Sequence, residues 1–419
     1  MTRFHRWILD EKDPSVILKR STVWNLASSL LNASATALII LCLSWSGKSE
    51  LSGVFSIATA IAYQVQAIGF FGVRNYHIQD VKSNYCFSEY VVINELSSVI
   101  MVAALCFMAF GRGYSLEKAL IILFYSLYRA VEIYEALFHD EYQRKGRIDI
   151  GLILQTVRFL ITLTILVVTI ITTGNMVLAC FMAFFSSVIL IWWQNRDFYK
   201  IFNCHIEKTT WKRTKKLAAI CLPICLTGFI SMYLTNASKY AIDQFLDDKA
   251  QGVFAVLFVP VFTINMLSLV IYRPYITKIA QEWHDEKTKD FIRDVARQVL
   301  VITMLTIGIT VFGYFIGLNL LALIYHMDLS SYQMDFVILL IGGGFNTYSV
   351  FLLQILVIVG CQNLSLVIYV LSLAVTWFSS QLLVEGFGLT GASILYLLSA
   401  VILVLGSIFV LIFKVRRRR

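Results

Sequence analysis

The feature that most limits the fold of this chain is a series of apolar runs, each about 20 residues long, separated by short polar segments. A run of that length, folded as a helix, spans the hydrocarbon core of a bilayer, which is about 30 Å thick. Of the 419 residues, 58% are hydrophobic and 15% are charged, whereas soluble domains average about 45–50% and about 25%. The sequence therefore excludes a cytosolic enzyme, a disordered protein and a secreted disulfide scaffold.

The apolar runs predict an all-α, polytopic membrane protein with about twelve transmembrane helices. Backbone polar groups in lipid must be satisfied internally, which favours helices, and the alternating ten-residue pattern of a membrane β-barrel is missing. We expect the spans at residues 23–46, 51–73, 91–111, 117–138, 151–173, 175–194, 216–235, 251–272, 299–325, 334–360, 362–384 and 388–414.

The distribution of Lys and Arg predicts the orientation of the chain in the membrane. If the N-terminus is cytoplasmic, the inside segments hold 28 of the 35 basic residues and the outside loops hold five. Cytoplasmic loops of membrane proteins collect Lys and Arg, so both termini are expected in the cytoplasm. The same distribution explains the net charge of +9 without a nucleic-acid partner.

The inside connection at residues 195–216 divides the predicted spans into six plus six. We expect two six-helix lobes, residues 1–208 and residues 209–419. Duplicated halves that surround a binding site are common in secondary transporters. The fold prediction is therefore two lobes around a central cavity.

Polar side chains recur at helical spacing within several of the predicted spans. Asn32 belongs to such a stripe in the first span, Gln66 to one in the second, and Gln155 and Arg158 to one in the fifth. Small polar residues are enriched where membrane helices pack together, and this structural explanation stays open for each stripe. Stripes at the start of both halves favour a shared wet cavity with Asn32, Gln66 and Gln155 in its wall.

The fourth predicted span carries the most informative residues, because Tyr125, Arg129, Glu132 and Glu135 share roughly one face of the helix. A charge at bilayer depth costs from about 3 to more than 10 kcal/mol, so it should face a partner or water. Arg129 and Glu132 are three residues apart and could neutralise each other as a structural pair. The functional interpretation is a cavity wall that meets an ionic cargo.

Arg158 and Glu95 are the other charged residues within predicted spans, and all five lie in the N-terminal half. The charged residues of the site are therefore expected to come mainly from the N-terminal half. The six His show no zinc-type spacing and no nucleotide-binding P-loop is present, so we predict no metal site and no cofactor.

Three segments in order resemble bacterial polysaccharide flippases of the O-antigen and capsule type, which belong to the multidrug/oligosaccharidyl-lipid/polysaccharide exporter superfamily. Residues 74–80 read RNYHIQD and are followed by Tyr85, Phe87 and Tyr90, where the family has Arg-Asn-Tyr-Gln-x-Ser-Asp. Residues 142–149 read YQRKGRID and resemble the family's loop between spans 4 and 5. His77 stands where Gln is usual, and Gln79 where Ser is usual.

The third segment, KYAID at residues 239–243, is similar to the family's region around spans 7 and 8. It is followed by Gly252, Pro260, Asn265, Arg273 and Pro274. The resemblance covers most of the first 300 residues.

The resemblance implies a transporter of the bacterial inner membrane that turns an oligosaccharide on polyprenyl pyrophosphate from the inner to the outer leaflet. Arg binds such an anionic headgroup in a bidentate way. The candidate cationic ligands are Arg74, Arg129, Arg158 and Arg273, with Lys239 as a weaker choice. The candidate sugar ligands are Asn32, Gln66, Tyr125 and Gln155. The expected partners are the lipid-linked oligosaccharide, membrane lipids and other polysaccharide-assembly proteins, with no nucleic acid.

Two other interpretations remain open from the sequence. A drug or metabolite antiporter of the same fold could use Glu95, Glu132 and Glu135 to couple transport to protons or sodium. A membrane-bound polymerase or glycosyltransferase would need catalytic acids or His on a sizeable outer loop, and the outer loops are short here. We therefore do not expect an enzyme.

Overall fold

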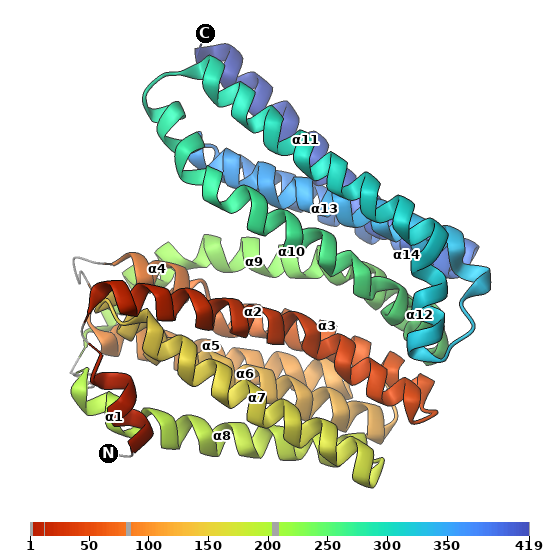
Figure 1. Cartoon of the computed structure of the whole chain (residues 1–419), viewed down its shortest axis with the longest axis horizontal. Helices are drawn as coiled ribbons and strands as arrows, with labels where there is room; N and C mark the ends of the chain where they lie inside the picture. The colour runs from red at the N-terminus through yellow and green to blue at the C-terminus, as the bar shows by residue number, and fades with distance from the viewer. Residues whose placement is uncertain (1–2, 12, 81–84, 203–208, 419) are drawn as a thin grey trace. The chain divides into compact units, whose positions relative to one another are not determined.

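The chain folds into a series of long helices that are joined by short connecting segments (Figure 1). The computed structural model describes residues 3–11, 13–80, 85–202 and 209–418. Within these ranges it contains fourteen α-helices and no β-strand. The prediction of an all-α chain is confirmed.

The helices belong to two compact units, which are described separately. Unit 1 comprises Met1–Ser46 and Ile57–Met232, and unit 2 comprises Gly47–Ser56 and Tyr233–Arg419. The expected lobes 1–208 and 209–419 stay a prediction about the moving parts of the protein.

Unit 1 is built from the helices of the N-terminal half. They are α1 (Arg3–Leu9), α2 (Pro14–Trp45), the part of α3 (Ser49–Phe70) that begins at Ile57, α4 (Val73–Gln79), α5 (Phe87–Phe110), α6 (Leu116–Arg144), α7 (Ile148–Thr173), α8 (Met176–Ile201) and the first part of α9 (Trp211–Phe245). Local sequence determines where some of these helices begin and end. The side chain of Asp13 accepts a hydrogen bond from Ser15 N and caps the start of α2 at Pro14. Gly174 adopts a left-handed conformation (φ 64°) and ends α7.

Unit 2 contains the rest of α9 and the helices that follow it. They are α10 (Asp248–His284), α11 (Thr288–Phe312), a π-helical turn (Gly313–Gly317), α12 (Leu318–Tyr325), a 3₁₀ turn (Ser330–Tyr332), α13 (Gln333–Ile358) and α14 (Gln362–Arg418). The last of these is two helices joined at Gly388, whose φ of 57° is not helical. The predicted break between residues 384 and 388 is confirmed.

Ten helices of the described chain are long and apolar enough to cross a membrane. That number treats α14 as one span and leaves out α6, which carries too many charges for an apolar window. Counting α6 and both parts of α14 gives twelve spans. The chain is therefore a multi-pass membrane protein with about twelve transmembrane helices, as the sequence predicts.

Several helices are longer than their apolar runs. α10 continues to His284 and α11 begins at Thr288, because charged residues extend these helices as polar turns beyond the apolar stretch. The predicted end of the seventh span at residue 235 is wrong, since α9 continues to Phe245. Asn236, Ser238 and Lys239 are buried in unit 2, so their polarity marks a packed face and not a loop.

Helix α6 is the central element of unit 1. Ser115 begins it by accepting a hydrogen bond from Lys118 N. Its sides pack against α5, α7 and α8, while α2 packs on α7; Figure 1 shows these helices running alongside one another. This arrangement brings the charges of α6 next to the polar stripe of α7.

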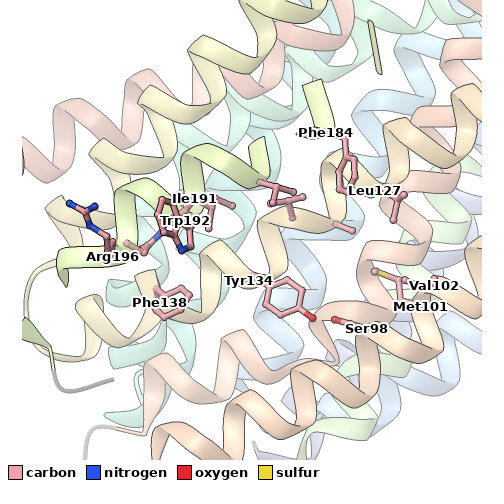
Figure 2. Close-up of a pocket in the computed structure, with 14 residues that line it drawn as sticks. Ser98, Met101, Val102, Leu127, Tyr134, Phe138, Phe184, Ile191, Trp192 and Arg196 are labelled. Carbon is pink, nitrogen blue, oxygen red and sulfur yellow. Dashed lines mark hydrogen bonds between the residues drawn. The ribbon is translucent and has the colours of Figure 1, made fainter. Parts of the chain in front are cut away.

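A groove of about 720 Å³ runs between α5, α6 and α8 (Figure 2). Its lining is mostly apolar and aromatic, and Arg196 lies at one end. No residue that the sequence predicts as part of the site lines this groove.

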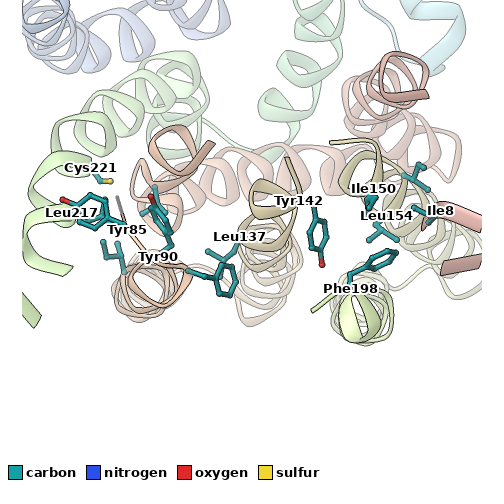
Figure 3. Packing of buried hydrophobic residues seen from close by; sticks show 14 residues of the cluster. Ile8, Tyr85, Tyr90, Leu137, Tyr142, Ile150, Leu154, Phe198, Leu217 and Cys221 are labelled. Carbon is teal, nitrogen blue, oxygen red and sulfur yellow. The ribbon is translucent and has the colours of Figure 1, made fainter. Parts of the chain in front are cut away.

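One end of unit 1 is closed by a hydrophobic cluster to which seven helices contribute (Figure 3). Ile8 comes from α1, Val73 from α4, Tyr90 from α5, Leu137 from α6 and Ile150 from α7. Phe198 from α8 and Leu217 from α9 complete it. Described residues of the three segments predicted to be cytoplasmic, 74–90, 139–150 and 195–216, therefore lie in one cluster of this unit.

Candidate functional site

Four charged side chains form a continuous network inside unit 1. Arg129, Glu132 and Glu135 come from α6, and Arg158 comes from α7. Both arginines are buried, at 4% and 0% exposure. Each carboxylate contacts an arginine, so the network carries two positive and two negative charges.

Arg158 has its donors occupied by the protein. Its Nε and Nη2 donate to the two oxygens of Glu135 at 2.8 Å and 2.6 Å, and its Nη1 donates to Ser187 Oγ on α8 at 2.9 Å. This bidentate geometry is the strongest form of a charge-assisted pair. Arg158 therefore ties α6, α7 and α8 together.

Arg129 is held by fewer bonds. Its Nη1 lies 2.7 Å from Glu132 Oε1 and 3.5 Å from Asn32 Oδ1, a long contact, and its Nε has no hydrogen-bond partner among the described residues. Its guanidinium carbon lies 4.9 Å from the ring centre of Tyr63, a cation–π arrangement. Arg129 is thus oriented by the protein but keeps donor capacity for another acceptor.

Glu132 connects the two arginines. Its Oε1 is 3.7 Å from Arg158 Nη2, in addition to its close contact with Arg129. Gln66 of α3 donates to Glu132 Oε2 at 2.9 Å and to the backbone oxygen of Arg129 at 3.0 Å. The Glu132 side chain is 13% exposed, against 2% for Glu135, so it is the more accessible carboxylate.

The predicted sugar ligands are only partly brought together. Asn32 and Gln66 contact the network directly. Tyr125 is buried on α6, with its ring 5.8 Å from that of Tyr128. Gln155 is partly exposed on α7, one turn before Arg158.

The remaining predicted residues lie on other helices. Glu95 is exposed on α5, Arg74 is exposed on α4, and Arg273 is exposed on α10 of unit 2. Lys239 is buried at 5% exposure on α9, where its Nζ lies 5.4 Å from the ring centre of Phe258. Within the described residues Lys239 is the only Lys or Arg of unit 2 that is buried.

The flippase-like segment at residues 74–80 forms α4 and anchors it to neighbouring helices. His77 Nε2 lies 3.0 Å from Glu141 Oε2, and its ring stacks on Tyr90 at 4.0 Å. Asp80 accepts hydrogen bonds from Tyr85 N and Tyr90 Oη. These contacts hold the end of unit 1 together.

Two adjacent carboxyls at the end of α6, beyond the predicted span, titrate differently. Burial raises the pKa of Asp140 to about 7, although Arg74, 3.5 Å away, lowers it. Burial also opposes ionisation of Glu141, but hydrogen bonds from His77, Lys145 and Arg144 outweigh it and lower the pKa of Glu141 to about 2. Neighbouring hydrogen-bond donors therefore give two carboxyls of similar burial different pKa values.

The sequence analysis did not single out Ser187, Tyr63 or Phe159 as site residues. Tyr63 belongs to the same helical polar stripe as Gln66, which is a usable signal. Ser187 is one of two adjacent serines in an apolar span, and its bond to Arg158 depends on how α8 packs. Phe159, whose ring centre lies 6.0 Å from the Arg129 guanidinium carbon, carries no distinguishing pattern.

The folded chain is similar to solved membrane transporters over almost its whole length. A multidrug-resistance MATE-family transporter of the MOP superfamily in an inward-facing conformation has a TM-score of 0.63 and 14% identity, covering 97% of this chain and 98% of the other. The Vibrio cholerae MATE transporter VcmN in its bent form has a TM-score of 0.62 and 13% identity, covering 97% and 98%.

A MOP-superfamily transporter from Pyrococcus furiosus, described as having a binding pocket of reverse polarity, has a TM-score of 0.61 and 11% identity, covering 97% and 96%. No protein-family model matches the chain, and a search of curated proteins finds no match. The chain therefore has the fold of MOP-superfamily membrane transporters.

The charges and free donors of the network determine which ligands this part of unit 1 can bind. Its two carboxylates are already neutralised by arginines, and the spare hydrogen-bonding capacity is that of a donor, Arg129. A site of this kind favours an anionic acceptor over a cation.

Proposed function

We propose that this protein is a transporter that flips a polyprenyl-pyrophosphate-linked oligosaccharide from the cytoplasmic to the outer leaflet by alternating access. The observation that carries the proposal is the environment of Arg129, which is buried, oriented and not saturated by its neighbours. A buried arginine with open donors is costly unless an anion uses them. We also propose that the protein lies in a bacterial inner membrane with both termini in the cytoplasm.

In this account Arg129 contacts the pyrophosphate and Arg158 acts as a positioning residue. Arg158 holds Glu135, and Glu132 lies close to both arginines. A phosphate oxygen that meets Arg129 can replace the long contact to Asn32, which frees that amide for the sugar. Gln66 already bonds to Glu132, so it orients the network before cargo arrives.

The remaining predicted ligands have subsidiary roles in this account. Tyr125 and Gln155 line the path of the sugar, and the exposed Arg74 and Arg273 attract the headgroup at the cytoplasmic mouth. Lys239 offers a second cation in unit 2. The two lobes, residues 1–208 and residues 209–419, are the bodies that move. The expected partners are other proteins that assemble the polysaccharide.

The second candidate function is a cation-coupled drug or metabolite antiporter. It is favoured by the descriptions of neighbours as multidrug-resistance MATE transporters and by the partial exposure of Glu132. Against it, Glu132 and Glu135 would each have to leave an arginine before binding a proton or sodium. Glu95 has no such restraint, because it is exposed.

The decisive experiment is deletion of the gene followed by analysis of surface glycan and of lipid-linked intermediates. The flippase proposal predicts loss of the surface polymer with lipid-linked repeat units retained on the inner leaflet. Complementation with Arg129→Lys should restore export partly and Arg129→Gln should not, at equal protein levels. Normal surface glycan together with increased sensitivity to cationic drugs would overturn the proposal in favour of the antiporter.

A further inference from the structure

The groove between α5, α6 and α8 has a mostly apolar lining and lies on one side of unit 1. Ala130, Tyr134 and Phe138 line it from α6, four residues apart, so they share one face of that helix. Phe184, Val188 and Trp192 repeat the same spacing on α8. From Phe184 to Arg196 the groove extends about 18 Å along α8, more than half of a hydrocarbon core of about 30 Å.

The lining of the groove suits hydrocarbon chains, because it is mostly apolar and aromatic. The rim is open to the surroundings, since Trp192 is 67% exposed and Val188 is 44% exposed. In a bilayer an apolar groove with an open rim fills with lipid chains.

One end of the groove differs chemically from the rest. Arg196 lies there (Figure 2). Its neighbour in the sequence, Asn195, also lines the groove, and Asn195 Oδ1 accepts a hydrogen bond from Tyr142 Oη at 2.8 Å. This end belongs to the segment 195–216, which carries seven basic residues and is predicted to be cytoplasmic. Lys and Arg at such a position attract the anionic lipids of the cytoplasmic leaflet.

A polar group within the groove also lacks a partner in the protein. Ser98 on α5 lines the groove, is 7% exposed, and its Oγ has no hydrogen-bond partner among the described residues. Buried hydroxyls are normally satisfied.

We propose that this groove is a binding site for an anionic glycerophospholipid, with an acyl chain lying between α5, α6 and α8 and the headgroup phosphate at Arg196. The site lies on unit 1 and includes no residue of the Arg129 network. This proposal therefore does not rest on the cargo proposed above.

The test is native mass spectrometry of the delipidated, detergent-purified protein after addition of phosphatidylglycerol or phosphatidylcholine with identical chains. We expect phosphatidylglycerol to be retained roughly tenfold better, the gain of one charge-assisted contact. Arg196→Gln should abolish that preference, whereas Lys216→Gln, at another exposed cation of the same segment, should keep it. Equal retention of the two lipids by the unmodified protein would overturn the proposal.

A second pair of variants tests the groove itself. Val188→Trp fills it, and we expect retention of phosphatidylglycerol to fall at least about fivefold. Phe185→Trp is the matched control, because Phe185 is 55% exposed on α8 and does not line the groove. Melting temperatures verify that both variants fold. Equal retention of phosphatidylglycerol by both variants would contradict the assignment.

Discussion

Unit 1 and unit 2 bury their basic residues in different ways. In unit 1, Arg129 and Arg158 share two carboxylates in one network, and only Arg129 keeps open donors. In unit 2, Lys239 makes no ion pair with the described residues and faces the ring of Phe258. The difference teaches that fixed geometry, and not the number of charges, distinguishes a candidate recognition site. An arginine held by Glu132 presents a defined fork, whereas a lysine presents a point charge.

The largest expected effect tests whether Arg158 is structural. Glu135→Ala leaves a fully buried guanidinium without its bidentate partner, so we expect a loss of about 3–5 kcal/mol of stability. The midpoint of thermal unfolding in detergent and the yield of folded protein measure it. The double variant Glu135→Leu with Arg158→Leu removes both charges and should recover most of the loss. Equal losses in the single and double variants would show that the pair is not what stabilises the fold.

The second prediction compares the two units through transport. Arg129→Gln should lower the export rate at least about tenfold, because it removes a charge-assisted contact worth about 1.5–3 kcal/mol. Lys239→Gln should lower it by less, since its ammonium presents no paired donors. Both rates are measured at matched protein levels in cells that lack the native gene. A greater loss with Lys239→Gln would move the recognition site to unit 2.

The third prediction separates the two carboxylates of the network. Glu132→Gln should destabilise the protein by about 1.5–3 kcal/mol, less than the change at Glu135, because the Glu132 side chain is more exposed and Arg158 keeps its main partner. The comparison is made by thermal unfolding under the same conditions. Glu95→Gln, on an exposed side chain of α5, is the control and should change nothing. A loss larger than that of Glu135→Ala would mean that Glu132 is the structural centre.

The fourth prediction concerns the end of α6, where the expected effect depends on pH. The pKa of Asp140 is raised to about 7 from 3.8, so the folded state binds a proton that the unfolded state has lost between these values. Stability contributed by this group is therefore present below about pH 4 and falls as pH rises to about 7. Asp140→Asn should grow more stable relative to the unmodified protein across that range, as measured by melting temperature. A difference that does not vary with pH would refute the shifted pKa.

Much of the fold follows from hydropathy and charge alone. The apolar runs locate the helices, and Gly388 breaks the last one where the pattern predicts. The polarity of residues 236–239 gives a wrong helix end, because these side chains are buried and hydropathy assigns them to a loop. Ser238, for example, donates a hydrogen bond to the backbone oxygen of Ala392. Hydropathy does not distinguish the two cases.

The site could be predicted only where its contacts are local. The Arg129–Glu132 pair follows from a spacing of three residues on one helix. The pairing of Arg158 with Glu135 could not be foreseen, because it depends on how α6 and α7 rotate against each other. The bond from Arg158 to Ser187 likewise depends on the position of α8.

The most direct test of the central claim is the affinity of the purified protein for polyprenyl pyrophosphate. The double variant Arg129→Gln with Glu132→Gln removes the pair without leaving a net charge in the network. We predict that it binds at least about tenfold more weakly than the unmodified protein, while its melting temperature still shows a folded state. The affinity of the same proteins for a lipophilic cation is measured in parallel. Unchanged affinity for the pyrophosphate lipid in the double variant would contradict the account.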